Sequence, residues 1–304
     1  MEANCTAGEE TQGVSGSKTG GETGRFAARN DAMEEDPKSG GSICFRGSGL
    51  LLIYHIGVAA HLQEHYDLST TRIAGTSGGS IVAGLLAAGV PMKEALDLHL
   101  KMAAMANTRI HGPFFDSLSI LMERVKALLP DDETVAARCT GRLRLALTQF
   151  PFMDARLVES FPTRDLLARS IVSSMNLPLF LSPVPPIDGN YYIDGALTLS
   201  GENPVFDDDT VTVSPVYMKA DIHPVQKPSL YYFVFPGDEF FTQEMFRQGY
   251  EDAAKARATL MGRGFIPVKG QATDDACSSI ASERVKEVQV LSPGHNDWAG
   301  VSLS

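Results

Sequence analysis

Two short motifs, far apart in the chain, carry the side chains best suited to chemistry. The first is Gly75-Thr76-Ser77-Gly78-Gly79, a Gly-x-Ser-x-Gly pattern between a strand-like run at 70–74 and an apolar run at 81–86. Such a tight strand-to-helix turn, with Gly75 and Gly79 lacking side-chain bulk, lifts the serine hydroxyl above a sheet. It also places Ser77 at a helix N-terminus, where the helix dipole stabilises negative charge. Ser77 is the candidate nucleophile, although a glycine- and serine-rich turn without chemistry fits the same pattern.

The second motif is Asp194-Gly195-Ala196, which directly follows the strand-like residues 191–193. A carboxylate fixed at a strand end can accept a serine proton directly if it lies within hydrogen-bond reach. The alternative is an ordinary Asp-Gly turn, of which Asp188-Gly189 is a second example. Serine nucleophiles more often use a histidine, and in the chain order of α/β-hydrolases only His223 and His295 follow the acid. Neither histidine has a distinctive sequence context, so these bases stay open beside Asp194.

A glycine turn about thirty residues before Ser77 offers backbone N–H groups. Gly47-Ser48-Gly49 lies between a strand-like run at 42–46 and an apolar helical run that begins at Leu50. Such N–H groups can stabilise the oxyanion of an acyl-transfer intermediate. A packing turn or a dinucleotide site are the alternatives, but the dinucleotide fingerprint needs a glycine where Leu52 stands. A P-loop is weaker still, because neither glycine turn is followed by Lys-Ser or Lys-Thr.

The order of these motifs resembles that of the patatin-like phospholipases, and more narrowly the adiponutrin and adipose triglyceride lipase branch. The similarity extends from about Ile43 to about Gly262. It rests on several sequence blocks that recur there in the same order. These blocks are 45–58 (FRGSGLLLIYHIGV), 129–132 (LPDD), 140–143 (TGRL), 161–165 (FPTRD), 185–186 (PP), 212–215 (TVSP), 221–224 (DIHP) and 247–250 (RQGY).

The resemblance implies a Ser–Asp dyad that works without histidine, metal or organic cofactor. Ser77 is then the nucleophile and Asp194 the general base. The resemblance also implies that the oxyanion amides belong to Gly47, Ser48, Gly49 and Leu50. Two departures bear on efficiency and substrate preference: Leu52 replaces the last glycine of the loop, and the asparagine that usually follows the Asp-Gly turn is displaced to Asn203.

The expected fold is α/β, a patatin-like three-layer α/β/α sandwich with a mainly parallel central sheet. Helical patterns that follow the first two strands predict parallel βα units with helices on both faces. Strands are predicted at 42–46, 70–74, 142–147, 157–161, 191–194 and 210–214, and helices at 50–65, 78–88, 92–106 and 164–175.

Composition predicts three regions: a disordered acidic arm at 1–40, an acyl hydrolase domain at 41–262 and a C-terminal tail at 263–304. The arm is rich in Gly, Ser, Thr and Glu, with eight acidic and four basic residues and no apolar signal segment. The net charge of −11 argues against nucleic acid or an anionic bilayer as partner. Four widely spaced cysteines indicate reduced thiols and no metal site, so we expect a cytoplasmic protein, peripheral on membranes or lipid droplets.

Two apolar segments raise the question of membrane contact. Residues 73–92 carry no charge and are long enough to span a bilayer, but they begin with the serine turn, so a buried helix is predicted instead. Residues 114–128 place Phe114, Leu118, Leu121, Val125 and Leu128 on one helical stripe. That stripe either packs on the core or forms a lid or adsorbing face.

The function expected from these residues is hydrolysis of lipid esters at a membrane or lipid-droplet surface, with triacylglycerol lipase activity foremost. Ser77 would attack the ester carbonyl as Asp194 takes its proton, and water would then release the fatty acid. Two alternatives stay open. One is transacylation to a lipid hydroxyl through the same dyad, and the other is a catalytically weak regulatory protein at a lipid surface.

Overall fold

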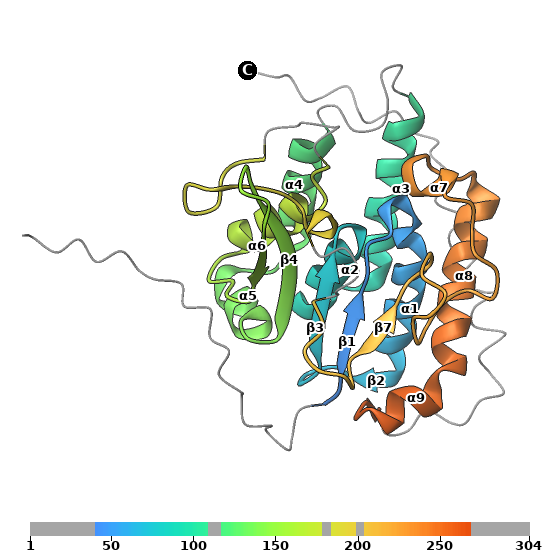
Figure 1. Cartoon of the computed structure of the whole chain (residues 1–304). Coiled ribbons are helices and arrows are strands. Elements are labelled where there is room, and N and C mark those ends of the chain that lie inside the picture. The colour runs from blue at the N-terminus through green and yellow to red at the C-terminus, as the bar shows by residue number, and fades with distance from the viewer. Residues whose placement is uncertain (1–39, 109–116, 178–183, 199–203, 269–304) are drawn as a thin grey trace, which may run out of the picture. The chain divides into compact units, whose positions relative to one another are not determined.

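The structure, a computed structural model, describes residues 40–108, 117–177, 184–198 and 204–268 (Figure 1). Its main sheet has six strands in the order β5-β4-β3-β1-β7, and β6 also pairs with β4. Strands β7, β1, β3 and β4 run parallel to one another, whereas β5 and β6 run antiparallel to β4. The predicted α/β class with a mainly parallel central sheet is confirmed. The strands are β1 (Ser42–Phe45), β3 (Arg72–Thr76), β4 (Leu143–Phe150), β5 (Asp154–Val158), β6 (Tyr191–Asp194) and β7 (Val211–Val213).

The four predicted helices are present, α2 with the predicted bounds and each of the others shifted at one end: α1 (Leu52–His65), α2 (Gly78–Ala88), α3 (Met92–Thr108) and α6 (Arg164–Ser174). Short 3₁₀ turns, η1 (Gly49–Leu51) and η3 (Gly195–Leu197), follow β1 and β6. A small antiparallel pair joins β2 (Tyr66–Asp67) to β8 (Ile266–Pro267). The helices not predicted from the sequence are α5 (Asp132–Cys139), α7 (Tyr231–Val234), α8 (Glu239–Lys255) and α9 (Arg257–Gly262).

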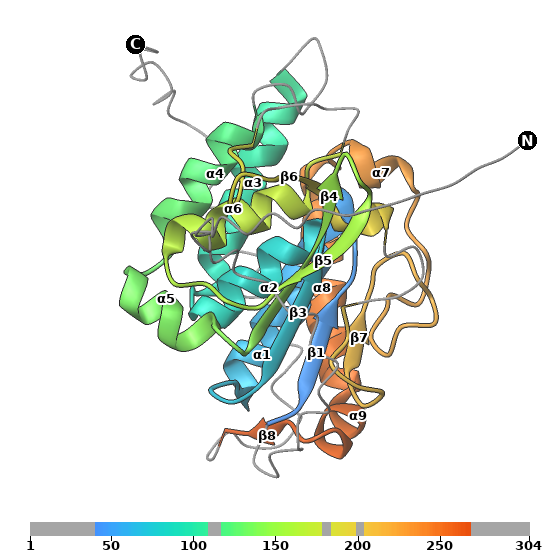
Figure 2. The ribbon, with the colours of Figure 1, turned by 60° about the vertical axis from the view of Figure 1, so that its left-hand side comes forward.

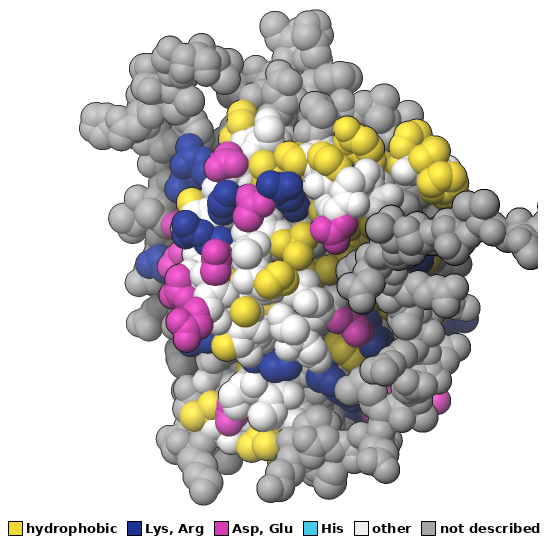
Figure 3. Space-filling view, turned by 90° about the vertical axis from the view of Figure 1, so that its left-hand side faces the viewer, with side chains coloured by type: hydrophobic (Ala, Val, Ile, Leu, Met, Phe, Trp, Pro, Cys, Tyr) yellow, Lys and Arg dark blue, Asp and Glu magenta, His cyan; other side chains and the backbone are white. Residues whose placement is uncertain are grey.

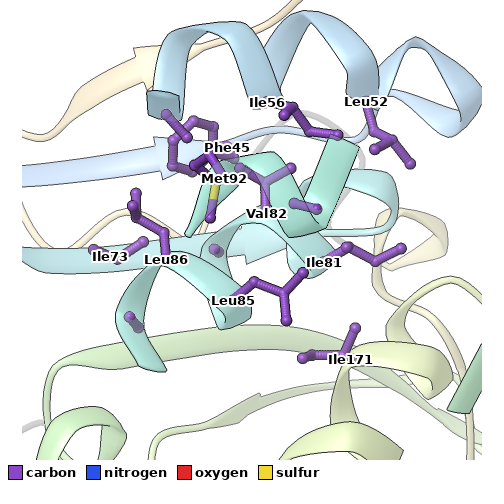
Figure 4. Close-up of a cluster of buried hydrophobic side chains, with 14 of the residues drawn as sticks. Phe45, Leu52, Ile56, Ile73, Ile81, Val82, Leu85, Leu86, Met92 and Ile171 are labelled. Carbon is purple, nitrogen blue, oxygen red and sulfur yellow. The ribbon is translucent and has the colours of Figure 1, made fainter. Parts of the chain in front are cut away.

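Helix α2 is the centre of the hydrophobic core. All of its residues are buried, as expected for a helix that is apolar on every side. Figure 4 shows Leu85 of α2 pointing toward Ile171 of α6, and both belong to the buried core cluster together with Ile81, Val82 and Met92. The uncharged stretch 73–92 is therefore a strand followed by a buried helix. In the described part of the chain, no helix is long and apolar enough to cross a membrane.

The opposite face of the sheet is covered by a polar loop. Register places Ala74 beside Arg144, and Arg72 lies two residues earlier on the same face of β3. The ring of Phe206 lies under both guanidinium groups, 4.9 Å from that of Arg72 and 4.2 Å from that of Arg144. Asp207 forms an ion pair with Arg72. The segment that contains Phe206 and Asp207 thus packs on this face through cation–π and ionic contacts.

The apolar stripe predicted at 114–128 forms helix α4 (Ser117–Leu128) and faces inward. Leu118, Leu121 and Val125 are buried in the core, where α4 packs on α6. The adsorbing-face interpretation of this stripe is wrong for these residues, because their apolar side chains are already covered by protein. Phe114, together with all but the last residue of the predicted arm at 1–40 and most of the predicted tail, lies outside the described residues. The predicted domain boundaries therefore stay predictions.

Candidate active site

Strand β4 brings the two predicted catalytic residues together along one edge. Strand β3 runs parallel to β4 and ends with Thr76 opposite Ala146. Strand β6 runs antiparallel to β4 and ends with Asp194 opposite Leu147, the next residue of β4. The ends of β3 and β6 therefore meet at adjacent register positions, a region visible beside the β4 label in Figure 2. Ser77 follows β3 at this meeting point.

Ser77 occupies a sharp turn between β3 and α2. Its φ of 53° and ψ of −131° are unfavourable for a residue with a side chain, and such strain is typical of functional sites. The flanking glycines are required by close packing. A Cβ at Gly75 would lie 2.7 Å from Cβ of Ala83, and one at Gly79 would lie 2.2 Å from the carbonyl oxygen of Phe45. The backbone therefore has the form predicted for a nucleophile turn.

The Ser77 hydroxyl donates a hydrogen bond to Oδ2 of Asp194 at 2.7 Å. The other carboxylate oxygen, Oδ1, accepts from the Ala196 N–H at 2.8 Å. Both side chains are buried, so this contact lies in a low-dielectric environment that strengthens it. Burial raises the pKa of the Asp194 carboxyl to about 6, against the two hydrogen bonds, which lower it. A carboxylate with this pKa is ionised at neutral pH yet basic enough to take a proton.

Ser174, at the end of α6, holds the turn in place. Its hydroxyl accepts from the Ser77 N–H at 3.0 Å and from the Ser80 hydroxyl at 2.7 Å, and it donates to the Ala146 carbonyl at 2.7 Å. Since Ala146 faces Thr76 in the sheet, Ser174 ties the turn, α6 and β4 to one another. Because the Ser77 N–H is occupied in this way, oxyanion stabilisation requires N–H groups from elsewhere.

The loop at Gly47–Leu50 lies directly beside Ser77. A Cβ at Gly47 would be 3.5 Å from Cβ of Ser77, and a Cβ at Gly78 would be 2.5 Å from the Gly49 carbonyl oxygen. Gly49 has a φ of +53°, a left-handed conformation that favours glycine. The structure thus brings the predicted loop against the serine turn. Leu52, the departure from the family pattern, begins α1 and is buried in the core.

The histidines of the described residues take no part in this arrangement. His223 contacts its own neighbour, with Nδ1 2.9 Å from the Pro224 carbonyl oxygen, and His55 contacts the Arg46 carbonyl. None of them hydrogen-bonds to Ser77 or Asp194. His295 lies outside the described residues. Within the described ranges, no group of His, Cys, Asp or Glu is arranged to hold a metal ion.

Sequence reasoning missed the residues that support the dyad. Besides Ser174, these include Thr148, which donates to the Asp194 carbonyl at 2.8 Å, and Asn176, whose carbonyl accepts from the Asp194 N–H at 2.9 Å. A serine at the end of an amphipathic helix and a threonine within a strand are common, so neither pattern is a signal. Only the Ala196 amide, two residues after Asp194, belongs to a motif that the sequence analysis singled out.

The chain was compared with protein families and with known proteins. The sequence model of the patatin-like phospholipase family matches residues 43–207, which is more than half of the chain. Patatin-like phospholipase domain-containing protein 2 of Mus musculus is 28% identical over 293 residues, covering 84% of this chain and 59% of that protein. This relative belongs to the branch that the sequence analysis identified.

Two further relatives carry transferase names. The 1-acylglycerol-3-phosphate O-acyltransferase Pnpla3 of Mus musculus is 28% identical over 247 residues, covering 72% of this chain and 59% of that protein. The Omega-hydroxyceramide transacylase of Homo sapiens is also 28% identical over 247 residues, with coverages of 72% and 46%. The chain thus spans less than two thirds of the length of these relatives. Among solved structures, VipD from Legionella pneumophila is 12% identical, with a TM-score of 0.43 over 83% of this chain and 75% of that chain.

Proposed function

Because the chain belongs to the patatin-like phospholipase family and has its α/β fold, we propose that it is a serine hydrolase of glycerolipid esters that works through a Ser77–Asp194 dyad. The observation that carries this proposal is the 2.7 Å hydrogen bond from the Ser77 hydroxyl to the Asp194 carboxylate. It joins a strained, buried serine to a buried carboxylate whose pKa is raised to about 6. Together these supply the nucleophile and the base of an acyl-transfer site.

In the first half-reaction, Asp194 Oδ2 accepts the hydroxyl proton as Ser77 Oγ attacks the ester carbonyl carbon. The carbonyl oxygen becomes an oxyanion, and the N–H groups of the loop at Gly47–Leu50 stabilise it. The tetrahedral intermediate then collapses and breaks the ester bond. The proton held by Asp194 passes to the departing alkoxide, which leaves as the alcohol. The acyl chain is left as an ester on Ser77.

In the second half-reaction, Asp194 accepts a proton from water as the water oxygen attacks the acyl-enzyme carbonyl. Collapse of the second intermediate returns the proton to Ser77 Oγ and releases the fatty acid. The Ala196 N–H, bound to Oδ1 of Asp194, keeps the carboxylate oriented throughout. Ser174 keeps the serine turn in place through the backbone N–H of Ser77.

A serine-reactive fluorophosphonate probe tests this proposal, with labelling read by intact mass. The wild type should gain one adduct, whereas Ser77→Ala should gain none and Asp194→Asn should react far more slowly. Asp188→Asn is the matched control, because Asp188 begins the other, exposed Asp-Gly turn of the region. A folded wild type that takes up no probe in buffer or in detergent micelles would contradict the proposal. A requirement for His223 or His295 would replace the dyad by a triad.

Transacylation is the second candidate, favoured by the names of the acyltransferase and transacylase relatives. The same acyl-enzyme would transfer its acyl group to a lipid hydroxyl in place of water, with Asp194 deprotonating that hydroxyl. Added monoacylglycerol or lysophospholipid distinguishes the two reactions. Under transacylation, labelled acyl chains appear in a new ester, whereas under hydrolysis they appear as free fatty acid at an unchanged rate.

A further inference from the structure

Exposed large hydrophobic side chains gather on two segments at the catalytic end of the sheet. The first group, here the hairpin patch, comprises Phe150, Phe152, Met153, Tyr191 and Leu197 on the β4–β5 hairpin, β6 and η3. The second, here the aromatic patch, comprises Leu230, Tyr231, Phe235 and Phe240, which lie from the residue before α7 to the first turn of α8. Phe152 is 72% exposed and Phe240 is 77% exposed, which is unusual for phenylalanine in a folded domain.

The hairpin patch is connected to the dyad by strand register. Asp194 lies opposite Leu147, and three residues further along β4, Phe150 lies opposite Tyr191. At the usual rise of an antiparallel strand, the tip of the hairpin extends roughly 10 Å beyond the dyad. Leu197 lies on the other side of Asp194, within η3. The hairpin patch therefore lies beside Asp194, the proposed general base.

The aromatic patch is connected to the oxyanion loop. Helix α7 packs on η1, and a Cβ at Gly49 would lie only 2.2 Å from the Phe233 carbonyl oxygen. Tyr231 and Phe235 lie two residues to either side of Phe233, and their rings stack with centroids 4.7 Å apart. In Figures 1 and 2, α7 and the far end of β4 lie at the same end of the molecule, where β1 and β3 also end. The two patches thus border the proposed active site from two directions.

The charge of these segments indicates what kind of surface covers them. Neither 150–153 nor 228–237 contains a charged residue, and each is followed by an aspartate, Asp154 and Asp238. The whole chain carries a net charge of −11. Figure 3 shows hydrophobic side chains along the upper edge of one face, with charged side chains of both signs below them and down the left side. An anionic surface would be repelled, whereas a surface without net charge accepts apolar side chains at no electrostatic cost.

We propose that the hairpin patch and the aromatic patch together form the surface by which this protein docks onto a lipid–water interface of zwitterionic phospholipid. The inference rests on the proposed function, since a hydrolase of lipid esters must take its substrate from such an interface. Phenylalanine and tyrosine side chains enter the headgroup region, and this places the end of the sheet that carries Ser77 against the lipid layer. Docking is hydrophobic, so it does not depend on salt.

The test measures co-sedimentation with phosphatidylcholine vesicles, in the Ser77→Ala background so that the vesicle stays intact. Phe152→Ser and Tyr231→Ser should each weaken binding about tenfold, and the double variant more than either. Met261→Ser is the matched control, because Met261 is 47% exposed on α9, at the other end of the sheet (Figure 1). It should bind like its parent. High salt should leave binding unchanged, and added phosphatidylserine should not strengthen it.

Each other outcome would overturn the docking surface. The first is that the parent protein does not bind vesicles, and the second is that Met261→Ser weakens vesicle binding as much as the patch variants do. The third is that binding requires phosphatidylserine and disappears at high salt. The fourth is that the patch variants differ from their parent in molar mass when no lipid is present. The last outcome would identify the patches as a contact between two copies of this chain. Thermal unfolding midpoints show whether each variant is folded. If the Ser77→Ala protein binds vesicles but the wild type takes up no fluorophosphonate, the proposed hydrolase is refuted and the docking surface is supported. If the wild type is labelled but the Ser77→Ala protein does not bind vesicles, the docking surface is refuted and the hydrolase is supported.

Discussion

Replacing Asp194 by asparagine should stabilise the folded protein at neutral pH while it removes the base. Burial raises the pKa of this carboxyl from 3.8 to about 6, so the folded state holds a proton that the unfolded state releases at lower pH. Ionisation of Asp194 therefore costs folding free energy as pH rises between these two values. A shift of about two units corresponds to about 3 kcal/mol at the plateau above pH 6, as an order of magnitude. Asparagine has the same shape and never carries this charge.

The assay is urea unfolding of the wild type and Asp194→Asn at a series of pH values from about 4 to about 8. Contributions from all other titrating groups cancel in the difference between the two proteins. That difference should shift in favour of the variant by about 2 kcal/mol between pH 4 and about pH 7, and then stay level, because the rest of the roughly 3 kcal/mol accrues below pH 4. Asp188→Asn is the matched control, because it makes the same substitution at an exposed position and leaves the buried Asp194 carboxylate in place.

Two results would refute this reasoning. If the difference between wild type and Asp194→Asn does not change with pH, the carboxyl does not titrate with a raised pKa in the folded state. If the difference moves the other way, the hydrogen bonds from Ser77 and Ala196 outweigh burial, and the pKa lies below its ordinary value. In that case Asp194 would be too weakly basic to serve as the base described above.

Three further predictions concern the same turn. The kcat/KM for a soluble ester should rise about tenfold per pH unit below pH 6 and level off above it, as measured by a pH–rate profile, because only ionised Asp194 accepts the proton. The free energy of unfolding in urea should be about 1 kcal/mol larger for Ser77→Gly than for Ser77→Ala, since only glycine relieves the positive φ. Equal free energies of unfolding would mean that the turn is not strained. Gly79→Ala should lose more than about 2 kcal/mol in urea unfolding, because its Cβ would meet the Phe45 carbonyl. Gly262→Ala, with open space around it, should be neutral or stabilising, and similar losses in both would contradict this packing argument.

The residues alone make Ser77 and Asp194 candidates, because a serine between glycines fits a nucleophile turn and a carboxylate at a strand end can act as a base. A glycine-rich turn without chemistry and a histidine base fit the same residues, and only the resemblance to the patatin-like family implies the dyad. Gly195 lets the chain after β6 pass close to the backbone of β4, because a Cβ there would lie 2.1 Å from the Ala146 carbonyl oxygen. The first half of the sheet follows from βα alternation for the same reason: each strand is short and apolar, and each glycine turn separates it from a helix.

Helix α8 could not be predicted in this way because its packing works against its own propensity. Gly249, which lowers helix propensity in the middle of α8, lies against α1, and a Cβ there would be 2.1 Å from the Tyr54 carbonyl oxygen. Gly57 of α1 makes the reciprocal contact with the Phe246 carbonyl. The two glycines let the helix backbones meet closely, and that gain exists only once both helices are formed. Local patterns cannot report it, because it depends on residues far apart in the chain.

The close contact between Ser77 and Asp194 also depends on pairing between residues far apart in the chain. The two residues are 117 positions apart, and their side chains meet because β3 and β6 end at neighbouring residues of β4. Register places both groups at strand ends that cannot move without breaking the sheet, so the fold itself holds the hydrogen-bond geometry that the proposed proton transfer needs. The same burial that fixes the geometry raises the pKa of Asp194, which makes the carboxylate both a better base and a cost to stability. A protein that kept this register but exposed Asp194 to water would gain stability and lose basicity together. The proposed activity and the expected stabilisation in Asp194→Asn therefore have one physical cause.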